Sequence, residues 1–536
     1  MKSLFATSWL LGAALAADVE DGFLCLRETN LGCAVEAVEE LEGDTSVEAG
    51  LLRARVLFHQ GRAAEAAEVM APLIPRTIEL DVKKLAGEMP GGSRASDETL
   101  LTFRGEKLKL GMEDEHAFMV ATAEVHAKLV ETRVGDVVVV HHPGIERILV
   151  EDAAECIRLA RERIAPRLGG DVPGVVRVEI YPDSASFTAA SGLPPDAIKT
   201  TGVVAIQKWN RIVMSSPRAL GKGYGWRDTL VHEWVHYVVS YNAKDKAPIW
   251  LQEGLAKSTE MLWRQDDFEL EIQKQSLLNG ALTTGEWITF EQMHPSMAYL
   301  PSAESAALAY AQVATMMEYL QVSTDRDALS RVIALVAEDE DSRDAVAEVS
   351  GRRFKKFEED WKEWLGDQDL VGERIATMPT VLDAGEAADF DPVLSRRKDL
   401  ANRARLGDLM AEREKYDAAL VYYDEAMPQD EPPSPYLALS KARVYVELGR
   451  PDDAVELLLE SRRYYPDVAD NNKLLAELIR ARGDDAEALE LYAHAAEINP
   501  FDLAVQQALV ELYRDSGERT LAARHAANVG VLEFRH

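Results

Sequence analysis

Two histidines and a glutamate stand at a spacing that can hold a metal ion. His232 and Glu233 are adjacent, and His236 follows His232 by four residues. In a helix each residue advances about 100°, so His236 falls about 40° and Glu233 about 100° from His232. The two imidazoles can therefore bind one zinc ion through nitrogens at about 2.0–2.1 Å. Glu233 lies beside them, placed to take a proton from water rather than to act as a ligand.

The residues around this pair predict a buried helix over 229–240. Thr229 and Ser240 share the arc of the histidines, and the opposite arc is apolar: Leu230, Val231, Trp234, Val235, Val238 and Val239. Such a stripe is typical of a helix that packs on a core. The alternative is a purely structural histidine pair. A chance match is uncommon in a chain with 11 histidines among 536 residues.

A third ligand is expected because zinc in hydrolases usually has three protein ligands and one open position. The best candidate is Glu253, in a second helical run that begins near Pro248. The sequence therefore predicts one zinc ion per chain, held by His232, His236 and Glu253.

These two segments together resemble the gluzincin metallopeptidases, and more closely their peptidase MA-like domains. There, a His-Glu-x-x-His helix is followed by Trp-Leu-x-Glu-Gly-Leu-Ala, which here runs from Trp250 to Ala256. The resemblance covers roughly residues 135–365. It implies an α+β, thermolysin-like zincin fold and hydrolysis of peptide bonds by a zinc-activated water, with Glu233 as the general base.

The resemblance also suggests an oxyanion-stabilising residue. Tyr310 follows Glu253 at a distance comparable with that of a tyrosine in the aminopeptidase N-type members. A tyrosine of the helix core over 302–322 is the alternative, and Tyr299 is a weaker rival.

Two departures from the aminopeptidase N-type members bear on specificity. Slightly fewer residues than usual separate His236 from Glu253. The stretch from Gly202 to Ile206 also lacks the glutamate that holds a substrate amino terminus in those enzymes. Both differences favour cleavage at an internal bond.

The net charge of −33 argues against nucleic-acid binding, because no basic field is available to displace counterions. Residues 1–17 have the charged start, short apolar run and small-residue end of a secretory signal peptide, which predicts a periplasmic or secreted protein. A buried N-terminal helix is the alternative. No later segment has the roughly 20 apolar residues that a transmembrane helix needs.

Three cysteines follow the predicted signal peptide. Cys25 and Cys33 could pair in an exported protein, which would leave Cys156 free. The other interpretation is that at least one of them is a small buried apolar residue.

Residues 18–110 predict a helical, tetratricopeptide-like region, from the spacing of Gly61 and Ala66 and the closing prolines. Whether this region acts as a pro-region stays open. Residues 111–367 form the predicted peptidase domain, with strands over 136–142, 175–181, 202–207 and 211–215 and helices over 151–168 and 302–322. Neighbours on a strand face opposite sides, so His141 and His142 cannot chelate one ion together.

Residues 368–400 predict a linker, and residues 401–536 a repeat array. Ala419, Ala454, Ala488 and Ala522 recur at intervals of 35, 34 and 34 residues, and a glycine precedes each of the last three by five. This is the tetratricopeptide pattern, which predicts three to four stacked helix pairs. The array could bind a protein partner or support the catalytic domain.

The sequence thus favours an exported zinc metallopeptidase that acts on a peptide or protein substrate. The alternatives are a catalytically silent tetratricopeptide scaffold and an envelope-associated assembly factor.

Overall fold

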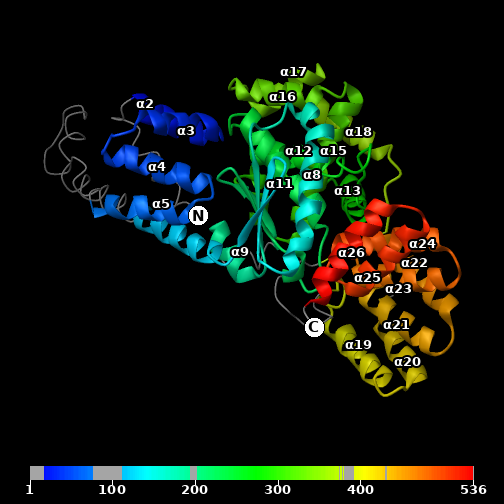
Figure 1. The fold of residues 1–536 in the computed structure, drawn as a ribbon. Coiled ribbons are helices and arrows are strands. Elements are labelled where there is room, and N and C mark those ends of the chain that lie inside the picture. Colours follow the sequence, from blue (N-terminus) through cyan, green and yellow to red (C-terminus); the bar gives the residue numbers. More distant parts are fainter. Residues whose placement is uncertain are drawn as a thin grey trace.

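The structure is a computed structural model that describes residues 17–75, 111–193, 202–373, 375–376, 378, 391–428 and 431–534. Residues 1–16 of the predicted signal peptide lie outside these ranges. Figure 1 shows N-terminal helices in blue, a sheet with surrounding helices in cyan and green, and a helical array in yellow to red. Among the described helices, none has the length and apolar character needed to cross a membrane.

A five-stranded mixed sheet lies beside the predicted metal helix. Its strands are β1 (Val130–Val134), β2 (Val137–His141), β3 (Val176–Tyr181), β4 (Ala205–Lys208) and β5 (Arg211–Ser215). The spatial order is β1-β2-β3-β5-β4. β3 pairs parallel with β2 and β5, whereas β1 and β4 are antiparallel edge strands. Of the five, only β1 was not expected from the sequence, because its side chains are mostly polar and exposed.

The β4–β5 hairpin brings the last edge strand next to the metal helix. Trp209 and Asn210 form its two-residue turn with φ of 53° and 56°, the conformation that matches the twist of flanking strands. One further hydrogen bond continues the pairing beyond the start of β4: Ser215 N donates to Val204 O at 2.8 Å. β4 therefore keeps one edge free of strand partners among the described residues.

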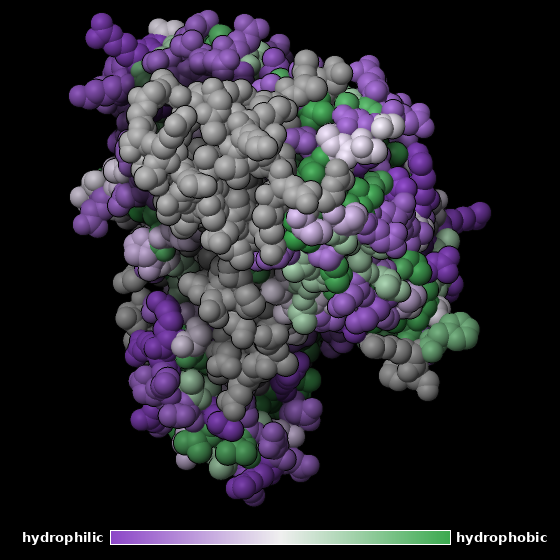
Figure 2. All heavy atoms as spheres, turned by 90° about the vertical axis from the view of Figure 1, so that its left-hand side faces the viewer, coloured by the Kyte–Doolittle hydropathy of each residue, from purple (hydrophilic) through white to green (hydrophobic). Residues whose placement is uncertain are grey.

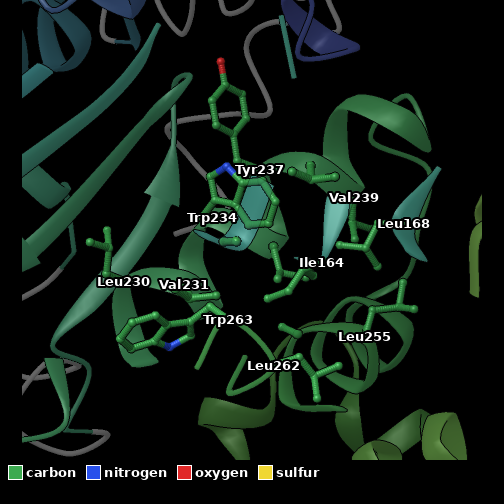
Figure 3. Packing of buried hydrophobic residues seen from close by; sticks show 14 of the residues in the cluster. Ile164, Leu168, Leu230, Val231, Trp234, Tyr237, Val239, Leu255, Leu262 and Trp263 are labelled. Atoms are coloured by element: carbon green, nitrogen blue, oxygen red, sulfur yellow. The ribbon is translucent and has the colours of Figure 1, made fainter. Parts of the chain in front are cut away.

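The predicted metal helix is α11 (Trp226–Asn242), and the helix that follows it is α12 (Ile249–Thr259). α8 (Leu149–Arg163) and α15 (Ala303–Ser323) pack on them. Figure 3 shows Val231, Trp234 and Val239 of α11 gathered with Ile164, Leu168 and Leu255. These side chains are fully buried, so the apolar stripe of α11 fixes its polar face toward β4 and α12.

The remaining described helices of the domain complete its outer layer. They are α9 (Ser184–Ser191), α13 (Ile272–Thr284), α14 (Phe290–Met293), α16 (Ala328–Ala337), α17 (Ser342–Ser350) and α18 (Phe354–Gly366). Short 3₁₀ turns are η4 (Ile145–Ile148), η5 (Ala165–Leu168), η6 (Pro217–Ala219) and η7 (Met297–Tyr299).

The described part of the N-terminal region, residues 17–75, is helical, and residues 76–110 of the expected helical region lie outside the described residues. It contains α2 (Ala17–Arg27), α3 (Leu31–Glu40), α4 (Val47–His59), α5 (Ala63–Met70) and η2 (Ala71–Leu73). Cys25 and Cys33 form a disulfide, and Cys156 is free and buried. The helix over residues 111–126 also belongs to this packing unit, because its Met112 and Met119 are buried against α4 and α5. The expected peptidase domain, residues 111–367, included that helix.

This N-terminal unit docks on the β4–β5 turn. Trp209 packs against Phe58 and Phe118, with ring centroids 5.4 and 4.9 Å apart. Asn210 donates to Thr29 O at 2.8 Å and pairs with His59 at 2.6 Å. Figure 2 views this side, where hydrophobic residues occur in separate groups among hydrophilic ones.

Four helix pairs form the C-terminal array. They are α19 (Lys398–Ala411) with α20 (Tyr416–Ala426), α21 (Pro435–Glu447) with α22 (Pro451–Tyr464), α23 (Ala469–Ala481) with α24 (Asp485–Ile498), and α25 (Leu503–Asp515) with α26 (Arg519–Glu533). The four repeating alanines are at most 4% exposed, and Gly449, Gly483 and Gly517 have positive φ in the turns. Small side chains are needed where paired helices touch, so the repeat prediction agrees with the packing.

The array contacts the peptidase-like domain directly before α11. Tyr224 N donates to Ile498 O at 3.1 Å, and Arg227 pairs with Glu497 at 3.4 Å. At the other end of the contact, Arg524 of α26 forms an ion pair with Glu155 of α8 at 2.5 Å. The array therefore supports the segment that leads into the metal helix.

Candidate metal centre

Three donor atoms from α11 and α12 converge on one point. His232 Nε2 lies 3.0 Å from His236 Nε2 and 3.3 Å from Glu253 Oε2, and the third side of the triangle is 3.4 Å. Two turns of α11 supply the histidines, and α12 crosses so that Glu253 faces them. Within the described part of the chain, this is the only group of three histidine, cysteine or acidic residues that could hold a metal.

The triangle fits a tetrahedral zinc site. Donors about 2.1 Å from a tetrahedral centre are about 3.4 Å from one another, close to the three observed separations. Glu253 Oε2 is buried and has no hydrogen-bond donor. A buried acceptor without a partner is costly unless a cation satisfies it. The donor set, two imidazoles and one carboxylate, is also that of catalytic zinc sites.

Two further residues, neither of them expected from the sequence, orient the histidines. Glu260 Oε2 lies 2.8 Å from His232 Nδ1, and Gln252 Oε1 lies 3.3 Å from His236 Nδ1. Because each Nδ1 has a hydrogen-bond partner, each Nε2 remains available to bind a metal ion. Of the two, Glu260 could be suspected from the sequence, because it follows Glu253 by two helical turns and so lies on the same face.

The charges of the cluster favour an ionised carboxylate pair. Burial opposes ionisation of Glu253, but the two imidazoles hold its pKa well below the usual range. Burial likewise opposes ionisation of Glu260, and Lys257 and His232 lower its pKa to about 2. Burial also disfavours charge on His232, yet Glu253 and Glu260 raise its pKa to about 9. Both carboxylates of this cradle of side chains are therefore ionised, so Glu253 can act as a metal ligand.

Glu233 faces the sheet edge next to this cradle. Its Oε2 accepts the N–H of Gln207 of β4 at 2.6 Å, and its side chain is buried. The N–H of Gln207 points away from β5, since Ser215 and Val204 set the alternation of the pairing. The carboxylate of Glu233 thus lies at the free edge of β4.

Tyr310 of α15 lies within electrostatic reach of the carboxylates of the same cluster. The charge of Glu253, then burial and the charge of Glu233, raise its pKa well above the usual value, so its hydroxyl stays protonated and can donate. Tyr299 is instead 62% exposed. His141 is buried, with Nε2 at 3.0 Å from Thr132 and Nδ1 at 2.9 Å from the carbonyl of His142. That pair of histidines is accounted for by local hydrogen bonds.

Comparison with known families agrees with this arrangement. Residues 160–367 match the family model of the Peptidase MA superfamily, and residues 439–502 match the tetratricopeptide repeat. No curated protein matches the chain.

Two solved structures show a weak likeness along most of the chain. The APC/C hetero-tetramer Cut9–Hcn1 has 10% identity over 99% of this chain and 96% of that chain, with a TM-score of 0.23. Yeast Tom70 has 13% identity over 96% and 92%, with a TM-score of 0.21. At such TM-scores neither likeness carries an argument about fold or function. The chain thus contains a Peptidase MA superfamily domain, which holds the candidate metal cluster, followed by tetratricopeptide repeats.

Proposed function

We propose that the protein is a zinc-dependent metallopeptidase of the gluzincin type with a thermolysin-like zincin fold. The observation that carries the proposal is the convergence of His232, His236 and Glu253 beside Glu233. A zinc ion held by the three ligands would supply a Lewis acid that polarises a carbonyl and acidifies water. The remaining chemistry is the work of the chain's own residues.

Glu233 is the proposed general base. Its carboxylate borders the cluster and is held by the N–H of Gln207, so it is positioned to take the proton of the attacking water and deliver it to the leaving amine. The phenol of Tyr310 is kept protonated by the neighbouring carboxylates. It can donate a hydrogen bond to the carbonyl oxygen as negative charge develops there.

The free edge of β4 is the proposed binding site for the substrate backbone. An extended peptide can pair with an exposed strand edge through main-chain hydrogen bonds, which do not depend on its side chains. Such pairing favours an internal bond as the cleavage site.

We also propose that the protein is exported and that its repeats bind a protein partner. The apolar stretch within residues 1–17 and the disulfide between Cys25 and Cys33 support export, because disulfides persist in oxidising compartments. The stacked helix pairs support protein binding.

Hydrolysis of an unfolded protein substrate by wild type and by Glu233→Gln tests the proposal. The variant should keep about one zinc per chain and lose at least about 10²-fold in kcat, the lower end for a general base. Glu291→Gln, an exposed glutamate of the same domain that pairs with Arg343 outside the cluster, should keep full activity. A Glu233→Gln protein that cleaves like wild type would disprove the assignment of the base. Complete inactivity of zinc-loaded wild type would favour the silent scaffold.

A further inference from the structure

A cavity of about 210 Å³ lies where the repeat array meets the peptidase-like domain. One wall is residues 220–225, the segment before α11, together with the start of α13. The other wall comes from the N-terminal ends of α21 and α23 and the connection between α22 and α23, with Tyr436, Tyr465, Asp467 and Asn471. Two domains far apart in sequence thus enclose one space.

Asn471, in the lining of this cavity, has a buried side-chain oxygen without a hydrogen-bond partner. The side chain is 3% exposed and its Nδ2 donates to Pro435 O at 3.0 Å, whereas its Oδ1 is buried without a hydrogen-bond partner. The orientation is fixed because a carbonyl oxygen can only accept. An unpaired buried acceptor calls for a donor from a ligand.

The adjacent Asn472 differs from Asn471 in that all of its polar side-chain atoms are paired. Asn472 is equally buried, but its Oδ1 accepts from Arg462 at 2.8 Å and its Nδ2 donates to Pro466 O and Val468 O. All of its polar atoms are used within the array. Asn472 is therefore structural, while Asn471 keeps a free acceptor at the cavity.

The other walls indicate what kind of group enters. The charged groups of the lining are already engaged. Asp391 accepts three backbone N–H groups and the Ser434 hydroxyl, and Asp467 pairs with His494 at 3.0 Å. Glu271 pairs with Lys274 at 2.5 Å, and Lys222 pairs with Asp470 at 3.7 Å. The rings of Tyr436 and Tyr465 add apolar surface, and the Tyr465 hydroxyl is, like Asn471 Oδ1, buried without a hydrogen-bond partner. A neutral N–H donor with an apolar body therefore fits better than an ion. The volume is below the roughly 300–1,000 Å³ of sites that enclose a whole small molecule, which suits a short stretch of a longer chain.

Tyr224 connects this cavity to the metal cluster. It lines the cavity, its hydroxyl donates to Ser215 O at 2.6 Å, and the charge of Glu233 contributes, after burial, to the rise of its pKa. Its backbone N–H also bonds to Ile498 of the array. The cavity therefore lies near the place where a polypeptide would bind at the cluster.

We propose that this cavity is a second polypeptide-binding subsite, which takes an N–H-bearing segment of an unfolded substrate outside the scissile bond. The inference rests on the proposed peptidase function and adds a class of substrate to it: extended chains rather than short peptides. Asn471 Oδ1 accepts from the bound segment, and the tyrosines cover its apolar part.

Binding and cleavage test the subsite separately. The probe for binding is fluorescein-labelled, reduced and carboxymethylated α-lactalbumin, and its Kd is measured by anisotropy on full-length, zinc-loaded protein carrying Glu233→Gln. Adding Asn471→Leu should raise the Kd about three- to tenfold, the effect of one hydrogen bond. Gln273→Trp, which fills the cavity from the other wall, should do the same. Glu477→Gln, an exposed control on the same helix, should leave the Kd unchanged.

In protein with Glu233 intact, kcat/KM for a short quenched-fluorescent peptide should be equal in wild type, Asn471→Leu and Gln273→Trp. Circular dichroism selects the variants that fold, and either cavity variant suffices. Unchanged Kd in a folded cavity variant would overturn the subsite, as would an equal loss on the short peptide. If wild type cleaves neither substrate, the peptidase proposal fails, yet the anisotropy comparison still tests the cavity.

Discussion

Glu260 shows how a single carboxylate can set the properties of the metal cluster. One oxygen lies 2.8 Å from His232 Nδ1 and the other 3.1 Å from the ammonium of Lys257. Holding Nδ1 fixes the ring so that Nε2 points at Glu253 and His236. The orientation of the ligand thus depends on a residue that is not a ligand.

Glu260→Gln should therefore weaken zinc binding by about tenfold, the lower end for loss of such a partner. Competition with a zinc-binding dye measures the affinity. Glu291→Gln removes a carboxylate whose partner is Arg343 rather than a histidine, and it should bind zinc like wild type. Equal affinities in both variants would show that Glu260 does not orient His232.

Tyr310→Phe should lower kcat by about 10²–10³ with little change in KM or zinc content, because a donor to the developing oxyanion acts only in the transition state. Tyr299→Phe is the matched control, since Tyr299 is 62% exposed, and it should keep wild-type rates. Steady-state kinetics on one peptide substrate compare the two. Loss of activity in Tyr299→Phe alone would reverse the assignment.

At this scale, the sequence predicted the residues whose relation is local. His232, Glu233 and His236 lie on one helix, so helical periodicity alone placed them together. Gln252 and Glu260 could not be assigned in this way, since their partners lie on α11 and depend on how α12 crosses it. The role of Tyr310 was inferred only from the resemblance to a family. Its proximity to Glu253 depends on how α15 packs, which helical periodicity does not show.

Among the elements, the turn before α11 contains a position that requires glycine. Gly223 has φ of +72°, and a Cβ there would lie 2.2 Å from Ile498 O of α24. Gly225, two residues on, has no atom within 4 Å of its would-be Cβ and a negative φ. An added methyl group would thus clash at Gly223 but not at Gly225.

Gly223→Ala should consequently separate the turn from the array, reduce the melting temperature and increase proteolysis between the two units, because both the backbone and the neighbouring carbonyl resist the side chain. Gly225→Ala should stay within about 0.5 kcal/mol of wild type, as is usual for sites without such conflict. Thermal unfolding with limited proteolysis distinguishes them. Identical behaviour of the two variants would mean that this contact does not hold the array.

Element prediction succeeded where hydrophobic pattern and packing agree. The stripe of α11 and the valines of β2 are buried on the expected sides. β1 was missed because an exposed edge strand needs little apolar surface: its pairing with β2 provides the hydrogen bonds that hold it. The position of β4 at the other edge depends on the sheet order, which strand patterns do not contain.

Across the whole molecule, the N-terminal helices cover the β4–β5 turn and Arg211 of β5. The guanidinium of the fully buried Arg211 lies 4.5 Å from the ring centroid of Phe58 and pairs with the buried Glu179. Removal of the helices would uncover this ion pair as well as Trp209. Exposed apolar and charged groups of this kind favour a permanent structural role over that of a detachable pro-region.

The repeat array should be held more tightly below neutral pH than above it. His494 lies 3.0 Å from Asp467 and 3.4 Å from Glu497. Burial lowers its pKa, but the two carboxylates prevail and raise it to about 9. Because the folded-state pKa exceeds the unfolded value of about 6.5, the stabilisation is complete below about pH 6.5 and is lost as the pH rises through about 9.

Wild type should therefore lose roughly 2–4 °C more in melting temperature than His494→Gln between about pH 6.5 and 9.5. Differential scanning calorimetry of both proteins in the same buffers measures the difference, and pH effects elsewhere in the molecule cancel. Parallel curves would show that His494 is not charged in the folded protein.

The measurement that tests the central claim most directly is the metal content of the purified protein, determined by plasma mass spectrometry after preparation with zinc and without chelator. The account predicts about one zinc per chain in wild type and far less in His236→Ala, which loses one of the three expected ligands. A wild-type protein without bound zinc would contradict the assignment of His232, His236 and Glu253 as a metal centre.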